Sequence, residues 1–483
     1  MRKKRVGLSI EMPVSQMFRY GRLLAMSAIV FVGSASVATS SENLRSALAK
    51  AYLKNPELAA ERARQRATDE AVPQALSGWR PTVVANGDYG GDFSKSRTRV
   101  YDPVTGQRDT VTVTDDRDTG GFTIALNQPI FDGFKTVYST KAAEATVDAG
   151  RQSLLGTEQA VLLDAVTAYV DVIRDRSIVV LRLKNVEALR EQLRASQARF
   201  DVGEITRTDV AQSKARLAEA ESALTVARAN VAASEAFYQR VIGKRPIKLR
   251  QPNGPLAKLP RTLKSALSMA EQTNPTILAA SFNEEASRFN IDVVRGDLLP
   301  SVSLQAQYGA VHRPSANVRT NQTGLIFGAI TIPLYQGGGV YSRVREAKQV
   351  NSQRRLQILD ARRIVRQNVV TSWSNIRAAD EALVSANEQV KANELAYAGV
   401  KQENLVGSRT TLDVLNAESE LLDSKVSVVL ARREQVISRY QLIASVGKLT
   451  SEYLNLGVAQ YDPTVNYNQV RDKLFGAEVD ESE

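Results

Sequence analysis

The chain contains one sequence element twice, and this duplication constrains its fold more than any other feature. The element Leu-x-Ser-Ala-Leu-x-x-Ala-x-x-x-Asn-Pro occupies residues 44–56 and returns at residues 263–275. The correspondence runs without a gap from 44–90 onto 263–309, a shift of 219 residues, and after a length change of 15 residues it resumes at a shift of 204. Any fold or function must therefore account for two copies of one unit.

We place the copies at residues 42–245 and 262–450, followed by a C-terminal tail at 451–483. Aromatic residues make up only 6% of the chain, while Ala, Leu, Val, Gln, Arg and Glu crowd the long segments, as is typical of extended helices. The chain has no cysteine, and His312 is its one histidine. Disulfides, thiolate metal sites and thiol catalysis are therefore excluded, and we expect no catalytic, cofactor-binding or metal-binding residues.

Residues 1–38 have the pattern of a secretory signal peptide. Basic groups precede an apolar run at Leu23–Val32, and Ser36-Val37-Ala38 fits a small-x-small cleavage site. The apolar run is too short to span a bilayer, which disfavours a membrane anchor. Removing this segment takes away six basic groups and one acidic group and lowers the net charge from +11 to +6, so the basicity does not indicate nucleic-acid binding. The mature chain is expected to be periplasmic, extracellular or an outer-membrane β-barrel.

Each copy is expected to open with two short helices that meet at an Asn-Pro pair. Asn55 and Asn274 are good N-caps, and the prolines that follow them fit the first position of the second helix. The second helices are expected to run toward Pro81 and Pro300, beyond which the spacing of apolar residues changes from helical to alternating.

The alternating pattern predicts one β-hairpin in each copy, at about 82–131 and 301–334, with one apolar and one polar face. The stretches 94–118 and 313–322 are polar and charged and are expected to be loops. Strands of about ten residues could cross a bilayer at a tilt, but four strands are too few for a single-chain barrel, which needs about eight. The hairpins must therefore find partners in other subunits, or lie on a soluble core.

Long coiled-coil hairpins are expected to follow, at about 135–243 and 339–448. Each would contain a first helix of roughly 100 Å, a turn at Gly203 or Gly407, and a return helix. The first helices carry an apolar residue at every seventh position: Val172, Val179, Val186, Leu193 and Phe200 in copy one, and Val369, Ile376, Leu383, Val390 and Tyr397 in copy two.

The turns of the coiled coils carry a capping pattern. Thr206-x-x-Asp209 and Thr410-x-x-Asp413 each place a hydroxyl and a carboxylate at the start of the return helix. Capping alone could explain both aspartates. Arg409 has no counterpart in copy one, where an isoleucine stands, so capping does not account for it.

This order of elements resembles the TolC family of outer-membrane channels. The resemblance covers residues 42–450, and its most specific part is the turn Gly-x-Arg-Thr-x-x-Asp-Val-Leu at 407–415, whose diverged twin lies at 203–210. The fold class it implies is an α+β membrane protein with an internal two-fold repeat. A homotrimer would form a twelve-stranded transmembrane β-barrel, with four strands from each chain, that continues into a long twelve-helix periplasmic α-barrel.

The family implies a location and a function as well. The chain would lie in the outer membrane of a Gram-negative cell, in contact with outer-membrane lipid, with its tunnel in the periplasm. It would be the exit duct of a tripartite efflux pump or of a type I secretion system, a passive conduit gated at its coiled-coil tip. Its partners would be a periplasmic adaptor (membrane fusion protein) and an inner-membrane pump, with no nucleic acid, no cofactor and no enzymatic activity.

By the same resemblance, Arg409 forms a latch with Thr208 and Asp209 that holds the tip closed. Asp413 contributes to a ring of carboxylates at the tunnel entrance, which would favour cations and be open to block by multivalent ones. The two tip turns are expected to dock the adaptor, through Gly203, Glu204, Ile205, Thr206, Gly407, Ser408, Arg409 and Thr410.

The chain departs from the family pattern at two positions near the tip. The second aspartate of the ring is Asn416 here, so the ring would be single and its preference for cations weaker. The tyrosine three residues before the turn glycine is Asn404 here, which puts one contact of the latch in doubt.

A second interpretation is a secreted structural protein that assembles into filaments. Its coiled-coil hairpins would form the filament, and the β-hairpins would decorate its surface. This protein would be recovered as a soluble polymer, whereas the duct would be recovered as a heat-modifiable trimer in outer-membrane fractions.

Overall fold

A computed structural model describes residues 42–252, 254–256, 258–315 and 317–479. The chain divides into two units, Met1–Ser40 and Ser41–Glu483, and the description below concerns the second. The signal peptide expected at 1–38 lies outside the described residues. Within the described ranges, no helix is both long enough and apolar enough to cross a membrane.

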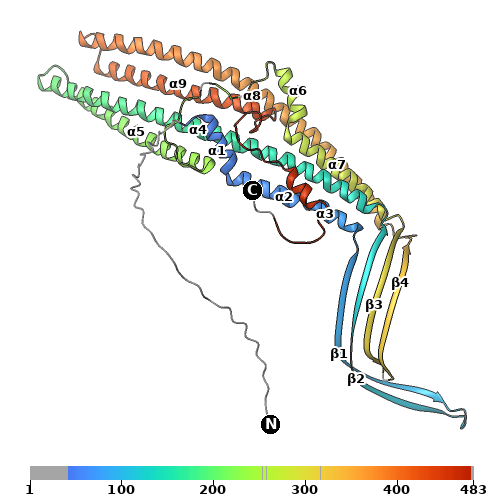
Figure 1. The fold of residues 1–483 in the computed structure, drawn as a ribbon. Helices are drawn as coiled ribbons and strands as arrows, with labels where there is room; N and C mark the ends of the chain where they lie inside the picture. Colours follow the sequence, from blue (N-terminus) through green and yellow to red (C-terminus); the bar gives the residue numbers. More distant parts are fainter. Residues whose placement is uncertain (1–41, 253, 257, 316, 480–483) are drawn as a thin grey trace, which may run out of the picture. The chain divides into compact units, whose positions relative to one another are not determined.

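The helices and strands follow one another in the same order in both copies. Copy one contains α1 (Leu44–Lys54), α2 (Pro56–Asp69), α3 (Ala71–Leu76), the short helix η1 (Ser77–Trp79), β1 (Thr82–Tyr101), β2 (Arg108–Phe131), α4 (Lys135–Asp201) and α5 (Arg207–Ile242). Copy two contains α6 (Leu263–Thr273), α7 (Pro275–Gly296), β3 (Ser301–Ser315), β4 (Val318–Thr331), α8 (Gly339–Leu405) and α9 (Thr411–Ser445), and α10 (Thr464–Val470) follows. The sheet and the coiled-coil turns lie at opposite ends of α4 and α8 (Figure 1).

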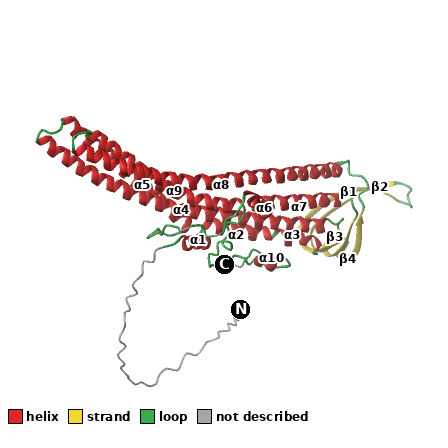
Figure 2. Ribbon diagram, turned by 90° about the horizontal axis from the view of Figure 1, so that it is seen from above, coloured by secondary structure: helices red, strands yellow, loops and turns green. Residues whose placement is uncertain are grey.

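The helices lie side by side in one layer (Figures 1 and 2). The helices α4 and α8 are 67 residues long, and each packs along its length against shorter helices. Helix α4 contacts α2 and α5 on one side and α7 and α9 on the other, and α8 contacts α7 and α9. The layer therefore has four columns, in the order α2 with α5, then α4, then α7 with α9, then α8.

An asparagine joins the two short helices of each composite column end to end. The Oδ1 atom of Asn55 accepts a hydrogen bond from the first turn of α2 at 2.9 Å, and its Nδ2 atom donates to the Val241 carbonyl of α5 at 3.0 Å. Asn274 makes the same pair of bonds, to the first turn of α7 at 2.9 Å and to the Ser445 carbonyl of α9 at 2.9 Å. Each side chain thus satisfies a free N–H group of one helix and a terminal carbonyl of another.

A proline distinguishes the two copies in the segment before the sheet. In copy two, α7 is continuous over Pro275–Gly296, whereas in copy one α2 ends at Asp69 and α3 begins at Ala71. Pro73 has no N–H group to donate to the Asp69 carbonyl, and its ring crowds that carbonyl. The break in copy one follows from this single residue.

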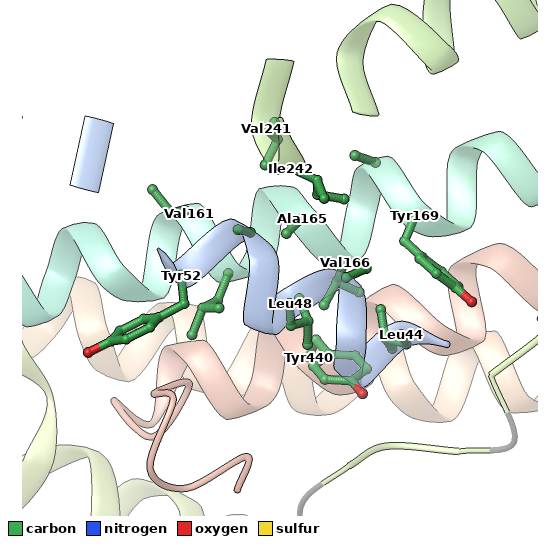
Figure 3. Packing of buried hydrophobic residues seen from close by; sticks show 14 of the residues in the cluster. Leu44, Leu48, Tyr52, Val161, Ala165, Val166, Tyr169, Val241, Ile242 and Tyr440 are labelled. Atoms are coloured by element: carbon green, nitrogen blue, oxygen red, sulfur yellow. The ribbon is translucent and has the colours of Figure 1, made fainter. Parts of the chain in front are cut away.

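The largest cluster of buried apolar side chains lies where α1 crosses α4, α5 and α9. Leu44, Leu48 and Tyr52 recur at every fourth position and form one face of α1. Figure 3 shows this face against side chains of α4 and α9, including Val166 and Tyr440. Leu48, Val166 and Tyr440 are fully buried. Helix α1 therefore fastens both copies to each other at this level of the layer.

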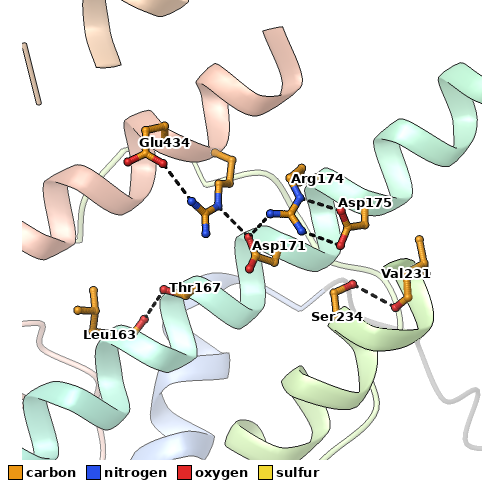
Figure 4. A network of polar contacts seen from close by, with 9 residues as sticks. Leu163, Thr167, Asp171, Arg174, Asp175, Val231, Ser234 and Glu434 are labelled. Carbon is orange, nitrogen blue, oxygen red and sulfur yellow. Dashed lines mark hydrogen bonds and ion pairs between the residues drawn. The ribbon is translucent and has the colours of Figure 1, made fainter. Parts of the chain in front are cut away.

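A polar network connects the copies along α4 (Figure 4). The Asp171 carboxylate pairs with Arg174 of α4 at 2.9 Å and with Arg433 of α9 at 2.8 Å. Asp175 is buried and pairs with Arg174 at 2.7 Å, and its hydrogen bond to the guanidinium raises the pKa of Arg174. The network compensates the buried charge and ties α9 to α4.

The four strands form one antiparallel sheet in the order β1-β2-β3-β4. The register places mainly apolar side chains on one face: Val83, Ala85, Tyr89, Phe122, Ile124, Leu126, Val302, Leu304, Ala306, Tyr308, Ile326 and Ile330. The other face carries many polar side chains, among them Asn86, Asp88, Thr123, Asn127, Ser303, Gln305 and Gln307. The rings of Phe122 and Tyr308 lie 6.0 Å apart on the apolar face.

The prediction of loops at 94–118 and 313–322 is wrong. Strands β1 and β2 contain 20 and 24 residues, and only 102–107 connects them. Strands β3 and β4 contain 15 and 14 residues. Charged side chains are compatible with a strand when both of its faces are exposed. The alternation of Thr and Val at 110–114 favours a strand there. All four strands are therefore longer than the ten residues expected from the sequence.

Residues 451–479 pack against the helical layer, although we placed a simple tail there. The Ser451 N–H group donates to the buried Glu158 carboxylate of α4 at 2.6 Å. Asn466 of α10 donates to Asp69 of α2 at 2.9 Å. Burial raises the pKa of both carboxyl groups. The segment therefore runs along α2 and α4 and is part of the folded unit.

Candidate functional site at the coiled-coil tips

Each coiled-coil hairpin ends in a turn that is built on a glycine. We call α4 with α5 hairpin one, and α8 with α9 hairpin two. Gly203 and Gly407 have φ values of +81° and +83°, a left-handed conformation that glycine adopts without strain. In hairpin one, the Gly203 N–H donates to the Phe200 carbonyl and the next N–H donates to the Arg199 carbonyl, both at 2.9 Å. Hairpin two repeats this pair of bonds, which closes the last turn of each long helix.

A capping box starts each return helix. The Thr206 hydroxyl accepts from the Asp209 N–H at 3.4 Å, and the Asp209 carboxylate accepts from the Thr206 N–H at 2.9 Å. The corresponding distances between Thr410 and Asp413 are 3.2 and 2.9 Å. Each threonine hydroxyl also donates to the aspartate carboxylate, at 2.7 Å in hairpin one and 2.8 Å in hairpin two. The bonds donated to the carboxylates lower the pKa of both, with the Thr206 hydroxyl as the largest cause at Asp209 and the Thr410 N–H as the largest cause at Asp413. Both aspartates are therefore negatively charged at neutral pH.

Arg409 is held by its own turn. Its Nε atom donates to the Glu403 carboxylate at 2.8 Å, and this hydrogen bond raises the pKa of Arg409. The Asn404 amide donates to the Arg409 carbonyl at 2.9 Å. Both Arg409 and Glu403 are exposed. The residue that replaces the family's tyrosine therefore stabilises the backbone of this turn.

The two tips carry ion pairs of opposite polarity. In hairpin one, the Nε atom of Arg199 donates to the Glu204 carboxylate at 3.1 Å. Arg199 and Glu403 occupy matching positions in the two copies, since they are 204 residues apart. The basic residue of the pair, Arg199, therefore lies on α4 in hairpin one, whereas the acidic residue, Glu403, lies on α8 in hairpin two. Neither Arg199 nor Glu403 was among the predicted site residues, although a comparison of the copies at this shift shows the reversal of charge.

The structure does not bring the expected latch residues together within one chain. Thr208 is exposed at the start of α5. Within the described ranges, no hydrogen bond or ion pair joins Arg409 to Thr208 or Asp209. Asn416 instead accepts a hydrogen bond from Arg216 of α5 at 3.0 Å, a contact between the hairpins that the sequence analysis also missed.

Hairpin one extends further than hairpin two. Arg216 lies ten residues after Thr206, whereas its partner Asn416 lies six residues after Thr410. The difference of one helical turn is about 6 Å. Below the turns, Leu415 of α9 packs with Leu189 and other apolar residues of hairpin one. The hairpins are therefore packed together below their tips, and the tip turns themselves are separate and exposed.

The tips carry fixed charges and hydrogen-bonding groups, with no arrangement suited to proton transfer or to nucleophilic attack on a substrate. Within the ranges that the structure covers, no group of three or more His, Cys, Asp or Glu residues is placed to hold a metal ion. The chemistry available at this site is electrostatic selection and contact with another protein surface.

Comparison with known proteins gives a consistent result. The pattern of a family described as outer membrane efflux protein matches the chain twice, at residues 47–244 and 266–448. The chain is similar to the outer membrane efflux protein BepC of Brucella suis biovar 1 (strain 1330), with 38% identity over 452 residues that cover 93% of this chain and 94% of BepC. It is also similar to the outer membrane protein TolC of Escherichia coli (strain K12), with 27% identity over 442 residues that cover 86% of this chain and 84% of TolC.

Among solved structures, the fold is similar to that of the Campylobacter jejuni CmeC outer membrane channel, with a TM-score of 0.71 and 16% identity. The similarity covers 89% of each chain. The two matched ranges of the family pattern lie within the copies predicted at 42–245 and 262–450.

Proposed function

The chain belongs to the outer membrane efflux protein family, and from this premise we propose how its parts work. It is an outer-membrane exit duct for efflux or type I secretion, and it is a channel rather than an enzyme. We propose that the working form is a homotrimer, in which three chains close a twelve-stranded barrel and a twelve-helix tunnel.

The trimer is supported mainly by the two open edges of the sheet, one on each side. The edge strands β1 and β4 have no further strand beside them among the described residues. Edge strands of 20 and 14 residues leave rows of N–H and C=O groups unpaired, and closing the barrel pairs them. Three chains of four strands and four helical columns make a ring that is continuous from the sheet to the tips.

The outer helix of the layer supports the same closure. Leu356, Val370 and Val384 of α8 are exposed by 64%, 39% and 65%, and they recur every 14 residues, which is two heptads. They lie outside the buried cores that α8 shares with its neighbours in the chain. At the opposite edge of the layer, Val226 of α5 is exposed by 58%. In the trimer, the stripe on α8 would pack against the α2 with α5 column of the next subunit.

The sheet would lie in the outer membrane, with its apolar face toward lipid and its polar face toward the channel. The polar face lines the interior of a barrel when the apolar face meets hydrocarbon. The helical tunnel would then project into the periplasm, and the coiled-coil tips would form its far end.

The tips would form the gate. Arg409 does not reach Thr208 or Asp209 in its own chain, so we propose that it does so across the subunit boundary. In the closed state it would exchange its bond with Glu403 for contacts with Thr208 and Asp209 of the neighbouring subunit. Three Asp413 carboxylates would surround the entrance and give it a preference for cations.

We infer that the partners are a periplasmic adaptor and an inner-membrane pump, as for TolC-family channels. The tip turns at 203–206 and 407–410 would form the docking surface for the adaptor. Their ion pairs of opposite polarity, Arg199 with Glu204 and Arg409 with Glu403, would give the adaptor a different charge pattern at each tip.

Cross-linking tests the trimer and the latch together, and the absence of cysteine in the chain makes the test clean. A chain with Thr208→Cys and Arg409→Cys should form a heat-resistant covalent trimer on oxidation, and its single-channel conductance should rise when the disulfides are reduced. Each single variant serves as the control. A cross-linked monomer would contradict the contact between subunits, and recovery of the wild type only as a soluble polymer would contradict the outer-membrane duct.

A further inference from the structure

The connection between β1 and β2 is a two-stranded ribbon that projects beyond the rest of the sheet. Strand β2 pairs with β3 only from Gly120 onward, and Gly120 lies opposite Tyr89. Among the residues that the structure describes, 90–101 and 108–119 therefore pair only with each other, and Figure 1 shows them extending past β3 and β4. The β3–β4 hairpin has no such extension, because β3 ends at Ser315 and β4 begins at Val318.

The base and the tip of the ribbon are both structured. At the base, Arg117 pairs with Asp92 and Asp115 and donates to the Pro314 carbonyl at 3.0 Å, which fixes the ribbon to the end of β3. At the tip, the Asp102 carboxylate accepts from the Val104 N–H and from a threonine hydroxyl, both at 2.8 Å. The ribbon is therefore a built element with two defined faces.

One face of the ribbon collects basic side chains. Lys95, Arg97 and Arg99 alternate along β1, and the register places Thr114, Thr112 and Thr110 opposite them. Arg108 follows on the same face, opposite Tyr101. We call Lys95, Arg97, Arg99 and Arg108 the basic face. All four side chains are exposed, and none makes an ion pair or a side-chain hydrogen bond with another described residue.

The opposite face has a different character. Ser96, Thr98 and Val100 lie there, opposite Val113, Val111 and Asp109. The four cations are thus confined to one side, at a spacing along β1 of about 7 Å. Two carboxylates, Asp116 and Asp118, lie on the same side as the cations but nearer to the barrel, opposite Phe93 and Gly91, and they mark the lower limit of the basic face.

The basic face continues the apolar face of the sheet. The pairing of β1 with β2 has no shift in register, so Val83, Ala85, Tyr89 and Phe93 point to the same side as Lys95. If the apolar face meets lipid, as proposed above, the hydrocarbon ends near Phe93, where the carboxylates of Asp116 and Asp118 face the same side, and the first cation, Lys95, lies about 7 Å beyond Phe93. The headgroup layer of a bilayer is roughly 5–7 Å thick on each side of its hydrocarbon core, so the basic face begins at the depth of the lipid phosphates.

We propose that the basic face binds the phosphate groups of lipids in the outer leaflet around the barrel. Unpaired arginine and lysine side chains in a row are complementary to a surface of phosphate groups. The ribbon would therefore hold the barrel to its lipid on the side away from the helices. This inference depends on the proposed position of the barrel in the outer membrane.

The ribbon offers a matched pair of substitutions as a test. Thr112→Glu adds a carboxylate to the basic face, opposite Arg97, and Thr98→Glu adds the same carboxylate to the other face, opposite Val111. Both threonines are exposed, so neither change is expected to disturb the fold. A third variant, with Lys95→Ser, Arg97→Ser and Arg99→Ser, removes three of the four cations. Its control removes the same charge beyond the end of α5, with Lys244→Ser, Arg245→Ser and Lys248→Ser.

Binding is measured by native mass spectrometry of the full-length protein in a neutral detergent, titrated with diphosphorylated lipid A. The triple substitution on the basic face should weaken binding at least about tenfold, since each basic residue near an anionic surface contributes severalfold to the affinity. Thr112→Glu should weaken it by a smaller factor, and Thr98→Glu and the control triple should leave it unchanged. Phosphatidylethanolamine, whose phosphate is balanced by its own ammonium group and which has no net charge, should bind equally to all variants. Inorganic phosphate should not displace lipid A at equal concentration.

Equal binding of diphosphorylated lipid A to the wild type and to the basic-face triple variant would overturn the inference, as would equal weakening by Thr98→Glu and Thr112→Glu. Equal binding of dephosphorylated and diphosphorylated lipid A to the wild type would show retention by the apolar band alone, and it would overturn the inference too. A wild type that is not a heat-modifiable trimer in the outer membrane would count against the proposed function instead. The two failures are therefore distinguishable.

Discussion

Replacing Asn274 by alanine should loosen the joint between α7 and α9, and its cost can be worked out from the structure. The side chain caps α7 through Oδ1 at 2.9 Å, and losing such a cap costs about 1 kcal/mol. Its Nδ2 atom also donates to the Ser445 carbonyl at 2.9 Å, at a position where Asn274 is buried. An unpaired carbonyl at this partly buried position adds about 1–3 kcal/mol. The expected total for Asn274→Ala is therefore about 2–4 kcal/mol.

Asn43 provides a matched control, because it caps α1 through a bond from the Ser46 N–H at 2.8 Å but is exposed and joins no second helix. Asn43→Ala should therefore cost only about 1 kcal/mol. The assay is hydrogen exchange monitored by mass spectrometry, which reports local opening without requiring reversible unfolding. In Asn274→Ala, the amides at the start of α7 and the end of α9 should exchange about 30- to 1,000-fold faster, since each 1.4 kcal/mol is a factor of ten.

The result that would refute this reasoning is an equal and local effect of the two substitutions. Asn274→Ala would then have removed only a cap, and the bond to α9 would contribute nothing to the column. An acceleration confined to α7, with α9 unchanged, would lead to the same conclusion.

Further predictions concern the tips and Gly447, which follows the end of α9. Arg409→Ala should raise the single-channel conductance of the trimer in planar bilayers by weakening the closed state, and an unchanged conductance would leave Arg409 as a surface residue. Asp413→Asn should reduce the cation preference, measured as the reversal potential in a salt gradient, together with block by multivalent cations; no change in either would leave only the capping role. In the wild type, the pKa of Asp413 is lowered, so the preference for cations should persist as the pH falls to 3.8, the ordinary pKa of an aspartate. The stabilisation from capping should likewise be lost only as the pH falls through the lower pKa of Asp413 in the folded state. Gly447→Ala should destabilise the end of α9 more than Gly203→Ala destabilises the tip. Both glycines have φ +81°, but only a Cβ added at Gly447 would collide with the Thr273 carbonyl. Equal shifts in the thermal unfolding temperature of the two variants would contradict this.

The long helices and their ends were accessible from sequence because their determinants are local. The heptad pattern predicted the first coiled-coil hairpin at about 135–243, and α4 and α5 span Lys135–Asp201 and Arg207–Ile242. The capping patterns at Thr206 and Thr410 act within four residues, and both have the hydrogen bonds of a capping box in the structure. The apolar and polar faces of the strands also follow from alternation within each strand.

The ends of the strands and the partners of the site residues were not accessible in this way. The polar and charged composition of residues 94–118 predicts a loop, whereas a ribbon with two exposed faces accommodates charged side chains on both. The turn sequence does not predict the hydrogen-bond partner of Arg409, because Glu403, Thr208 and Asp209 can all accept from a guanidinium. The structure places the Nε atom of Arg409 2.8 Å from the Glu403 carboxylate of the same turn, and the latch with Thr208 and Asp209 stays a prediction.

The sequence by itself determined the duplication, the order of elements, the long helices and the chemistry of the turns, since each depends on residues within a few positions of one another. The tertiary structure decided which of these elements meet. The second bond of Asn55 reaches a carbonyl 186 residues away, and that of Asn274 reaches one 171 residues away, and together they make columns out of separate helices. The strand register, which aligns the basic face of the ribbon with the apolar face of the sheet, was decided at the same level. Such contacts depend on the relative positions of distant segments, which packing sets and which no local pattern encodes.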